Sequence, residues 1–143
     1  MMEWLIPALI RARNSTLKRV RDLSEAELDL GGTDLVSIRD IACHIATCDN
    51  AVIRIFNPDL AYDDRIYPGL AEGRTREEVM RYLDEQLQKK CAVVAGNLDR
   101  LGEKTVHSTY GEITIGEAVL CSGIDHEAHH RGQIALIRKN NDI

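Results

Sequence analysis

The sequence predicts an all-α fold, a four-helix bundle formed by a single domain over residues 1–143. Four segments of similar length place apolar residues at steps of three and four, which is the spacing of one helix face. No segment shows a convincing strand pattern, and four amphipathic helices without a sheet pack most simply as a bundle. The loops between helices are long in two places, so a simple up-and-down bundle with minimal turns does not follow from the pattern.

The first helix is expected over residues 4–23, with Pro7 tolerated in its first turn. Residues 24–27 resemble a capping box for one further short turn. The second helix opens at Ser37 with Asp40 three residues on, and Asn57-Pro58 ends it. Its apolar stripe consists of Ile38, Ile41, Ile45, Cys48, Val52 and Ile55.

Residues 58–74 are rich in Asp, Pro and Gly and predict a loop long enough to cover a site. The third helix opens with a capping box at 75–78 and is expected to stop at Gly102. Residues 105–113 are ambiguous and include a short extended segment before a turn at Gly111. The fourth helix is expected from Thr114, with Glu117 three residues on, to about Lys139.

The bulk properties exclude several classes of protein. A net charge of -5 argues against nucleic acid as a partner, because binding the phosphate backbone requires a basic surface. No apolar stretch is long enough to span a bilayer, and the N-terminal residues do not resemble a signal peptide. The four cysteines have no CxxC pairing, so they are interpreted as reduced thiols of a cytoplasmic protein.

The fourth helix carries polar residues where core residues are expected. Its core-facing stripe is predicted to be Ile115, Val119, Ser122, His126, His130, Gln133 and Ile137. His126 and His130 are four residues apart, so both imidazoles lie on one helix face, one turn apart. Burying such groups without partners would cost roughly 1 to 3 kcal/mol each, so something must satisfy them.

A divalent metal would satisfy them if a third ligand were available. His44 is the best candidate, because it lies on the apolar face of the second helix. Together, His44, His126 and His130 would bind Zn, Ni, Fe or Mn and leave a coordination position open. Such a site lowers the pKa of a bound water or thiol. The alternative is a metal-free bundle in which water and neighbouring groups satisfy the histidines.

Several neighbours of these histidines have a functional and an ordinary interpretation. Cys48 is a fourth ligand or a small buried hydrophobe. Asp40 orients His44 or only caps its helix. Glu127 is a base or part of a solvated helix face. His129 lies about 100° around the helix from His130 and is not expected to be a ligand, and His107 is interpreted as a solvated loop residue.

These residues resemble the signature of the DinB/YfiT-like superfamily, whose members are regarded as metal-dependent enzymes. The resemblance rests on residues 126–134 with 136–138, on 110–114 before the fourth helix, and on 37–44 at the start of the second. It covers nearly the whole chain in order, and its C-terminal motif is quite specific. The chain departs from many relatives because it stops at residue 143 without their extended tail.

The resemblance implies a four-helix bundle with an unusual helix order, commonly a homodimer, that holds a divalent metal through His44, His126 and His130. The family's HRGQ element corresponds to residues 130–133, in which Gly132 would permit close helix approach and Gln133 would support a ligand. Characterised relatives include transferases and isomerases that use bacillithiol, mycothiol or glutathione. The metal is thought to activate the thiol of that cofactor.

The expected function is therefore a metal-dependent thiol S-transferase, or a related small-molecule enzyme that activates a thiol or water on the three-His site. Its cofactors would be a divalent metal and a low-molecular-weight thiol, and its partner a small-molecule substrate. No catalytic side chain is assigned. The alternative is a non-enzymatic stress-response or metal-binding protein in which the same metal is structural.

Overall fold

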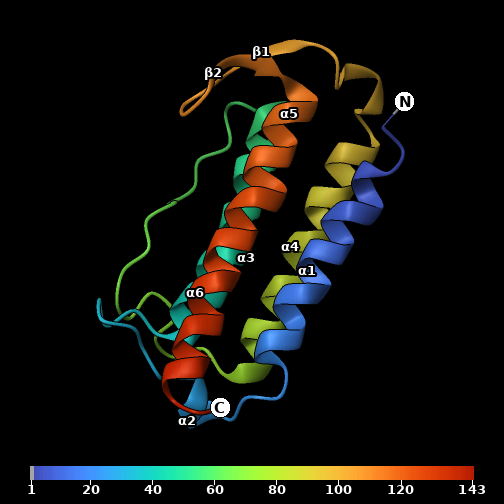
Figure 1. Ribbon diagram of the computed structural model, residues 1–143. Helices are drawn as coiled ribbons and strands as arrows, with labels where there is room; N and C mark the ends of the chain where they lie inside the picture. Colours follow the sequence, from blue (N-terminus) through green and yellow to red (C-terminus); the bar gives the residue numbers. More distant parts are fainter. Residues whose placement is uncertain (1) are drawn as a thin grey trace.

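A computed structural model describes residues 2–143. It is mostly helical, with one small sheet (Figure 1). The helices that precede the sheet are α1 (Leu5–Val20), α2 (Glu25–Leu28), α3 (Ile38–Phe56) and α4 (Arg76–Ala95). The last helix consists of three consecutive segments: α5 (Ile115–Leu120), the π turn η2 (Cys121–Asp125) and α6 (His126–Asn140). In the part of the chain that is described, no helix has the length and apolar character needed to cross a bilayer.

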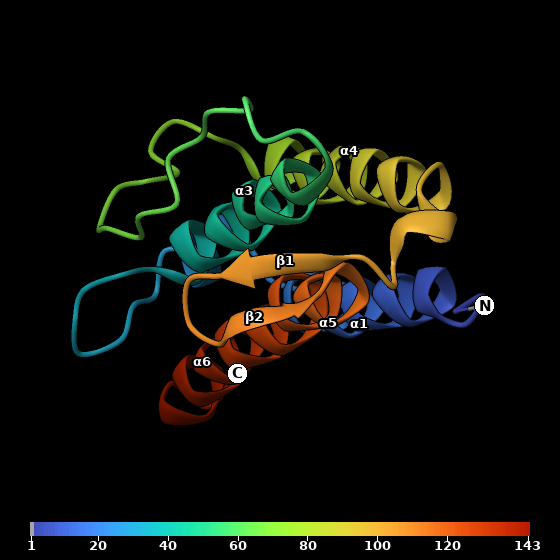
Figure 2. The same cartoon turned by 90° about the horizontal axis from the view of Figure 1, so that it is seen from above.

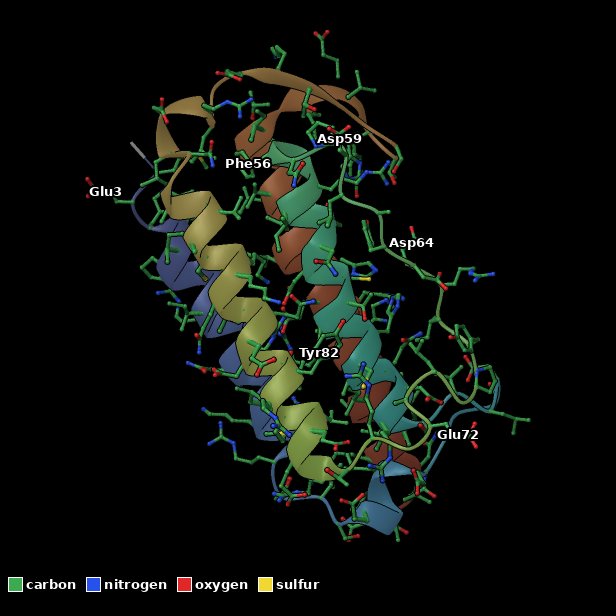
Figure 3. The ribbon with its side chains drawn as sticks, turned by 180° about the vertical axis from the view of Figure 1, so that it is seen from behind. Glu3, Phe56, Asp59, Asp64, Glu72 and Tyr82 are labelled. Carbon is green, nitrogen blue, oxygen red and sulfur yellow. The ribbon has the colours of Figure 1, made fainter. Side chains whose placement is uncertain are left out.

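The long helices lie side by side, and each packs on two others. α1 contacts α4 and α6, and α3 also contacts α4 and α6. The segment 57–75 runs back along the outside of α3, so α4 starts at the same end of the molecule as α3 and runs in the same direction (Figures 1 and 3). The predicted long loop therefore runs back along α3.

A β-hairpin caps one end of the otherwise helical chain, in the segment that the sequence left ambiguous, and the short extended segment before a turn at Gly111 is present there. β1 (Lys104–His107) pairs antiparallel with β2 (Gly111–Thr114), and the hairpin lies across the start of α5 (Figure 2). The turn requires Gly111, whose φ is +72°. An isolated hairpin is marginally stable, and this one is anchored because the backbone amide of Ile115 donates to the carbonyl of Glu103 at 2.8 Å.

The capping patterns predict where helices begin, and the structure confirms them. Each of three helices has a reciprocal capping box: Ser37 with Asp40, Thr75 with Glu78, and Thr114 with Glu117. The predicted end of the third helix is wrong, because α4 ends at Ala95 and Gly96 forms its C-cap. A short 3₁₀ turn, η1 (Leu98–Arg100), follows before Gly102.

The apolar core is divided into two clusters along the bundle. The cluster near α2 includes Val20, Leu28, Ile38, Ile41, Ile45, Val79, Leu83, Ile134 and Ile137. The cluster near the hairpin includes Leu5, Leu9, Val52, Val94, Leu101, Ile115 and Val119. A layer of four buried charged residues separates the clusters, namely Arg13, Asp49, Lys90 and Glu127. This charged layer lies at the level of the histidines.

Candidate metal centre

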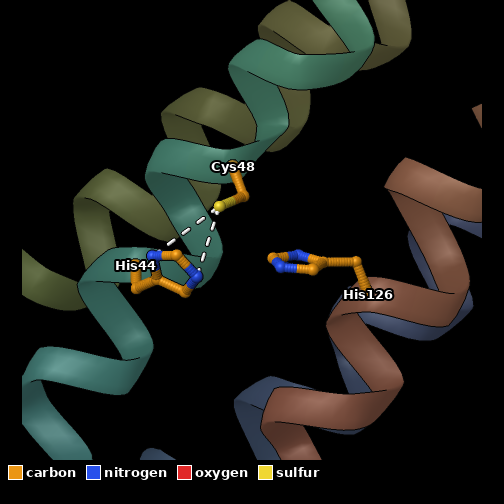
Figure 4. A group of neighbouring side chains, drawn as sticks. All are labelled: His44, Cys48 and His126. Carbon is orange, nitrogen blue, oxygen red and sulfur yellow. Dashed lines mark hydrogen bonds between the residues drawn. The ribbon is translucent and has the colours of Figure 1, made fainter. Parts of the chain in front are cut away.

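Three histidines meet between α3 and α6. The Nε2 atom of His130 lies 3.1 Å from that of His44 and 3.1 Å from that of His126. His44 and His130 are buried, with 3% and 6% of their surface exposed, and His126 is half buried. Figure 4 shows His126 pointing from α6 toward His44 on α3. The structure thus brings together the three side chains that the sequence singled out.

Hydrogen bonds among the three rings cannot satisfy all three nitrogens. Each ring nitrogen either donates one hydrogen or offers one lone pair in the plane of its ring. The Nε2 atom of His130 therefore serves at most one of its two neighbours, and its ring is turned by 83° and 77° from the rings of His44 and His126. Two imidazole ligands of a tetrahedral zinc ion would have their nitrogens about 3.3 Å apart. The observed 3.1 Å separations fit such an ion well.

The position of the proton on His130 follows from its other nitrogen. Its Nδ1 atom lies 2.7 Å from Oε1 of Gln133, and the amide oxygen can only accept, so Nδ1 carries the hydrogen. The Nε2 lone pair is then directed toward the other two imidazoles. This is how metal-binding histidines are usually oriented.

Burial keeps the three imidazoles neutral. It lowers the pKa of His44 to about 4, and repulsion from His130 and His126 adds to the effect. Burial also lowers the pKa of His130 to about 4, against the opposing hydrogen bond to Gln133. The pKa of His126 is lowered as well, chiefly by burial. At neutral pH the nitrogens therefore have free lone pairs, and a metal need not displace protons from them.

Cys48 lies beside the same cluster, but its sulfur is oriented differently. Ligand atoms of Cys48, His44 and His126 lie within 4.8 Å of one another. The Sγ atom is 3.4 Å from Nε2 of His44 and 3.7 Å from its Nδ1 (Figure 4). A sulfur almost equidistant from both ring nitrogens is not placed along the Nε2 lone pair. In this conformation the Nε2 atom of His130, whose ring Gln133 orients, lies 3.1 Å from each of the other two Nε2 atoms.

Asp40 caps its helix and does not orient His44. Its carboxylate accepts the backbone amide of Ser37 at 3.2 Å, that of Gly69 at 3.0 Å and that of Ala71 at 2.8 Å. Two of these donors belong to the long loop. Asp40 thus fastens the loop at the end that leads into α4.

Glu127 departs from both interpretations made from the sequence. It is buried, with 4% of its surface exposed, so it is not part of a solvated face. Its Oε1 atom accepts from Nε of Arg13 at 2.9 Å and from the hydroxyl of Thr16 at 2.7 Å. An ion-paired carboxylate facing the core is not placed to act as a base toward the histidine cluster.

The HRGQ element divides its roles between two faces of α6. His130 and Gln133 face the cluster, while Arg131 donates to the backbone carbonyl of Ala12 at 3.1 Å and ties α6 to α1. Gly132 is exposed, and a Cβ added there would meet nothing within 4 Å. The expectation that Gly132 permits close helix approach is therefore wrong.

Gly123 is the glycine that a close approach requires, and it lies in the π turn η2. A Cβ at this position would come within 2.8 Å of the side chain of Leu9 and 3.3 Å of that of Val52. The π turn ends immediately before His126. Such turns add one residue to a helix and are frequent at functional sites, and here the turn determines which face of α6 presents His126.

A pocket of about 390 Å³ opens above the cluster. Its walls come from α3, the long loop, the hairpin turn and the last helix, and they include Cys48, Tyr62, Asp64, His107, Tyr110, Cys121, Ser122, Asp125 and His126. Asp64 and Asp125 are its carboxylates, and no Lys or Arg among residues 2–143 lines it. His107, interpreted from the sequence as a solvated loop residue, belongs to this wall, and its ring stacks on Tyr110.

The charged layer behind the cluster was not predicted from the sequence. Each of its members sits on the apolar stripe of its own helix, where a hydrophobic residue is usual. On α1, for example, Arg13 lies between Leu9 and Val20, and on α4 Lys90 lies between Leu83 and Val94. A charge at a core position of all four helices is the signal that would have revealed it.

Searches of curated proteins and of solved structures found no match to this chain. The family model of the DinB superfamily matches residues 8–134, which include all three histidines of the cluster and most of every long helix. The chain therefore belongs to the DinB superfamily.

Proposed function

We propose that this DinB-superfamily protein binds a divalent metal through His44, His126 and His130, and that it is a metal-dependent thiol S-transferase or a related enzyme. The convergence of three Nε2 atoms beneath a pocket is the observation that supports the proposal most strongly. Imidazole ligands suit Zn, Ni and Fe, and Mn is a further candidate. When bound, the metal would lower the pKa of a thiol or of water.

The chain's own residues would prepare the site for this chemistry. Gln133 holds the proton of His130 on Nδ1, and burial keeps His44 and His130 neutral. The pocket is bounded by the hairpin and the loop, and Cys48 and His126 line it next to the cluster. A low-molecular-weight thiol and an electrophilic small molecule would meet in this pocket.

Metal analysis of protein purified without a His tag tests the first part of the proposal. We expect about one equivalent of metal in the wild type and a strong loss in His126→Ala. A conjugation screen with bacillithiol, mycothiol and glutathione then tests the second part. Absence of stoichiometric metal after reconstitution of the wild type would contradict the proposal.

A structural metal is the second candidate, and the position of Cys48 favours it. If its side chain rotated to place Sγ on the ion, the site would have four protein ligands and no open position. His126→Ala would then lower the melting temperature of the metal-loaded protein strongly. Under the catalytic proposal the same variant loses activity while the fold survives.

We also propose that the helices form the DinB/YfiT-type bundle with its characteristic order, and that the single domain 1–143 acts as a cytoplasmic homodimer. The parallel course of α3 and α4 and the family membership support the helix order. Light scattering coupled to size-exclusion chromatography tests the dimer, for which a mass near twice 16.0 kDa is expected.

A further inference from the structure

The charged layer lies directly behind the histidine cluster and takes one residue from each long helix. Arg13 comes from α1, Asp49 from α3, Lys90 from α4 and Glu127 from α6, and all four are buried. Asp49 follows Cys48 in sequence, and Glu127 follows His126. The two carboxylates are therefore on the same two helices as the histidines, but they point into the core.

Arg13 joins these two helices through a single guanidinium. Its Nη2 donates to Oδ2 of Asp49 at 2.7 Å, and its Nε donates to Oε1 of Glu127 at 2.9 Å. Its Nη1 donates to the backbone carbonyl of Leu83 on α4. A planar guanidinium has donors in fixed directions, so these bonds hold α3 and α6 at a defined separation.

Lys90 completes the charge balance without providing the same constraint. Its ammonium is 2.6 Å from Oδ1 of Asp49 and 3.8 Å from Oε2 of Glu127. The layer thus contains two positive and two negative groups. Removing Arg13 together with Glu127 would leave Lys90 paired with Asp49, so no buried charge would lose its partner.

We propose that Arg13 is a positioning residue for the metal centre. By bridging Asp49 on α3 and Glu127 on α6, it sets the distance between the helix that carries His44 and the helix that carries His126 and His130. This inference rests on the proposed function, because it assumes that the three histidines bind a metal. Metal ligands must be held to within about 0.5 Å, so a small change in helix separation matters at the site.

A residue that only stabilises the fold would behave differently. Buried ion pairs can often be replaced by apolar residues of similar size without loss of stability, provided that no charge is left unpaired. If Arg13 contributes only stability, a variant that restores stability should restore metal binding too. If Arg13 positions the helices, metal binding stays weak although stability is recovered.

The experiment compares three variants with the wild type by Co²⁺ titration, the visible spectrum of the Co²⁺ complex, and urea unfolding of the metal-free protein. Arg13→Lys keeps the charge but replaces the planar guanidinium, whose donors have fixed directions, with a shorter side chain that ends in a single ammonium. Arg13→Met/Glu127→Leu removes the bridge without leaving an unpaired charge. Leu5→Ala is the matched control, because it lowers stability from the same helix α1, within the cluster near the hairpin.

We expect the Kd for Co²⁺ to rise tenfold or more in Arg13→Lys and in the double variant, with a changed visible spectrum, even where the double variant unfolds at the same urea concentration as the wild type. Leu5→Ala should keep the wild-type Kd and spectrum while it is folded. A double variant with wild-type Kd and spectrum would overturn the inference and leave the metal site standing. A wild type that binds no Co²⁺ would overturn both the inference and the proposed function. If Arg13→Lys does not fold, the double variant decides.

Discussion

Replacing Gln133 with Leu should weaken metal binding without unfolding the protein. The Gln133 oxygen receives the Nδ1 hydrogen of His130 at 2.7 Å, and this bond directs the His130 Nε2 lone pair to the point where His44 and His126 meet it at 3.1 Å. Leu has a similar size and no acceptor. The hydrogen of His130 is then free to move to Nε2, where it blocks the metal.

The size of the effect can be estimated from the bond that is lost. Groups that orient a metal-binding histidine are typically worth 10- to 100-fold in affinity, or about 1.4 to 2.7 kcal/mol. A hydrogen bond between neutral groups accounts for about 1 kcal/mol of this. The remainder is the cost of holding His130 in the tautomer that binds metal.

Competition for Zn²⁺ with a chromogenic chelator at pH 7.5 measures this affinity directly. Gln88→Leu is the matched control, because Gln88 lies on the exposed face of α4, where its side-chain amide donates to the Asp84 carboxylate at 2.7 Å. Urea unfolding of both metal-free variants checks that the fold persists. An affinity of Gln133→Leu within twofold of the wild type, or an equal loss in Gln88→Leu, would refute the reasoning.

Three further predictions concern acid, ligand charge and the π turn. Folding lowers the pKa of His44 and of His130 from 6.5 to about 4, so the unfolded chain binds more protons than the folded protein between these pH values. The metal-free protein should therefore lose roughly 2 to 4 kcal/mol of unfolding free energy from pH 7 to pH 5. Urea midpoints that do not fall over this pH range would contradict the prediction. Because Asp64 and Asp125 line the pocket and the described residues place no Lys or Arg there, the Co²⁺-loaded protein should bind the cationic thiol cysteamine more tightly than the anionic thiol 3-mercaptopropionate. This preference should shrink when Asp64 and Asp125 are both changed to Asn. Equal affinities for the two thiols in spectral titrations of the wild type would count against the prediction. A π turn holds one residue more than an α turn, so deletion of Ser122 should convert the turn to regular helix and leave Co²⁺ binding intact. A one-residue deletion between His126 and His130 should abolish Co²⁺ binding. Loss of Co²⁺ binding in the Ser122 deletion would show that the turn itself is required.

Local patterns in the sequence predict much of this fold. Ser37 with Asp40 and Thr75 with Glu78 identify two helix starts, because a capping box involves only residues three apart. Helical spacing placed His44, His126 and His130 on faces that could meet, and the structure brings them together. These features depend on contacts within a few turns of one helix.

Features that depend on distant contacts could not be predicted in the same way. The pairing of the two hairpin strands is one example, because each strand is four residues long, too short to show a period, and the hairpin is held by the backbone around Glu103. Glu127 looked solvated because its partner, Arg13, is 114 residues away. The buried face of the last helix also differs from the predicted stripe: Gly123, Glu127 and Ile134 are buried, one residue after the predicted Ser122, His126 and Gln133. The π turn before His126 adds a residue and so shifts the helical period.

The long chain segment between the two ligand-bearing helices has a consequence for kinetics. His44 and His130 are 86 residues apart, and all of α4 and the hairpin lie between them. Docking α3 against α6 closes this long loop, and closing it lowers the conformational entropy of the chain. A metal that binds the docked helices and not the unfolded chain would stabilise the native state alone. Its effect should then appear as slower unfolding, with little change in the rate of folding, so that a bound ion would mainly lengthen the lifetime of the folded protein.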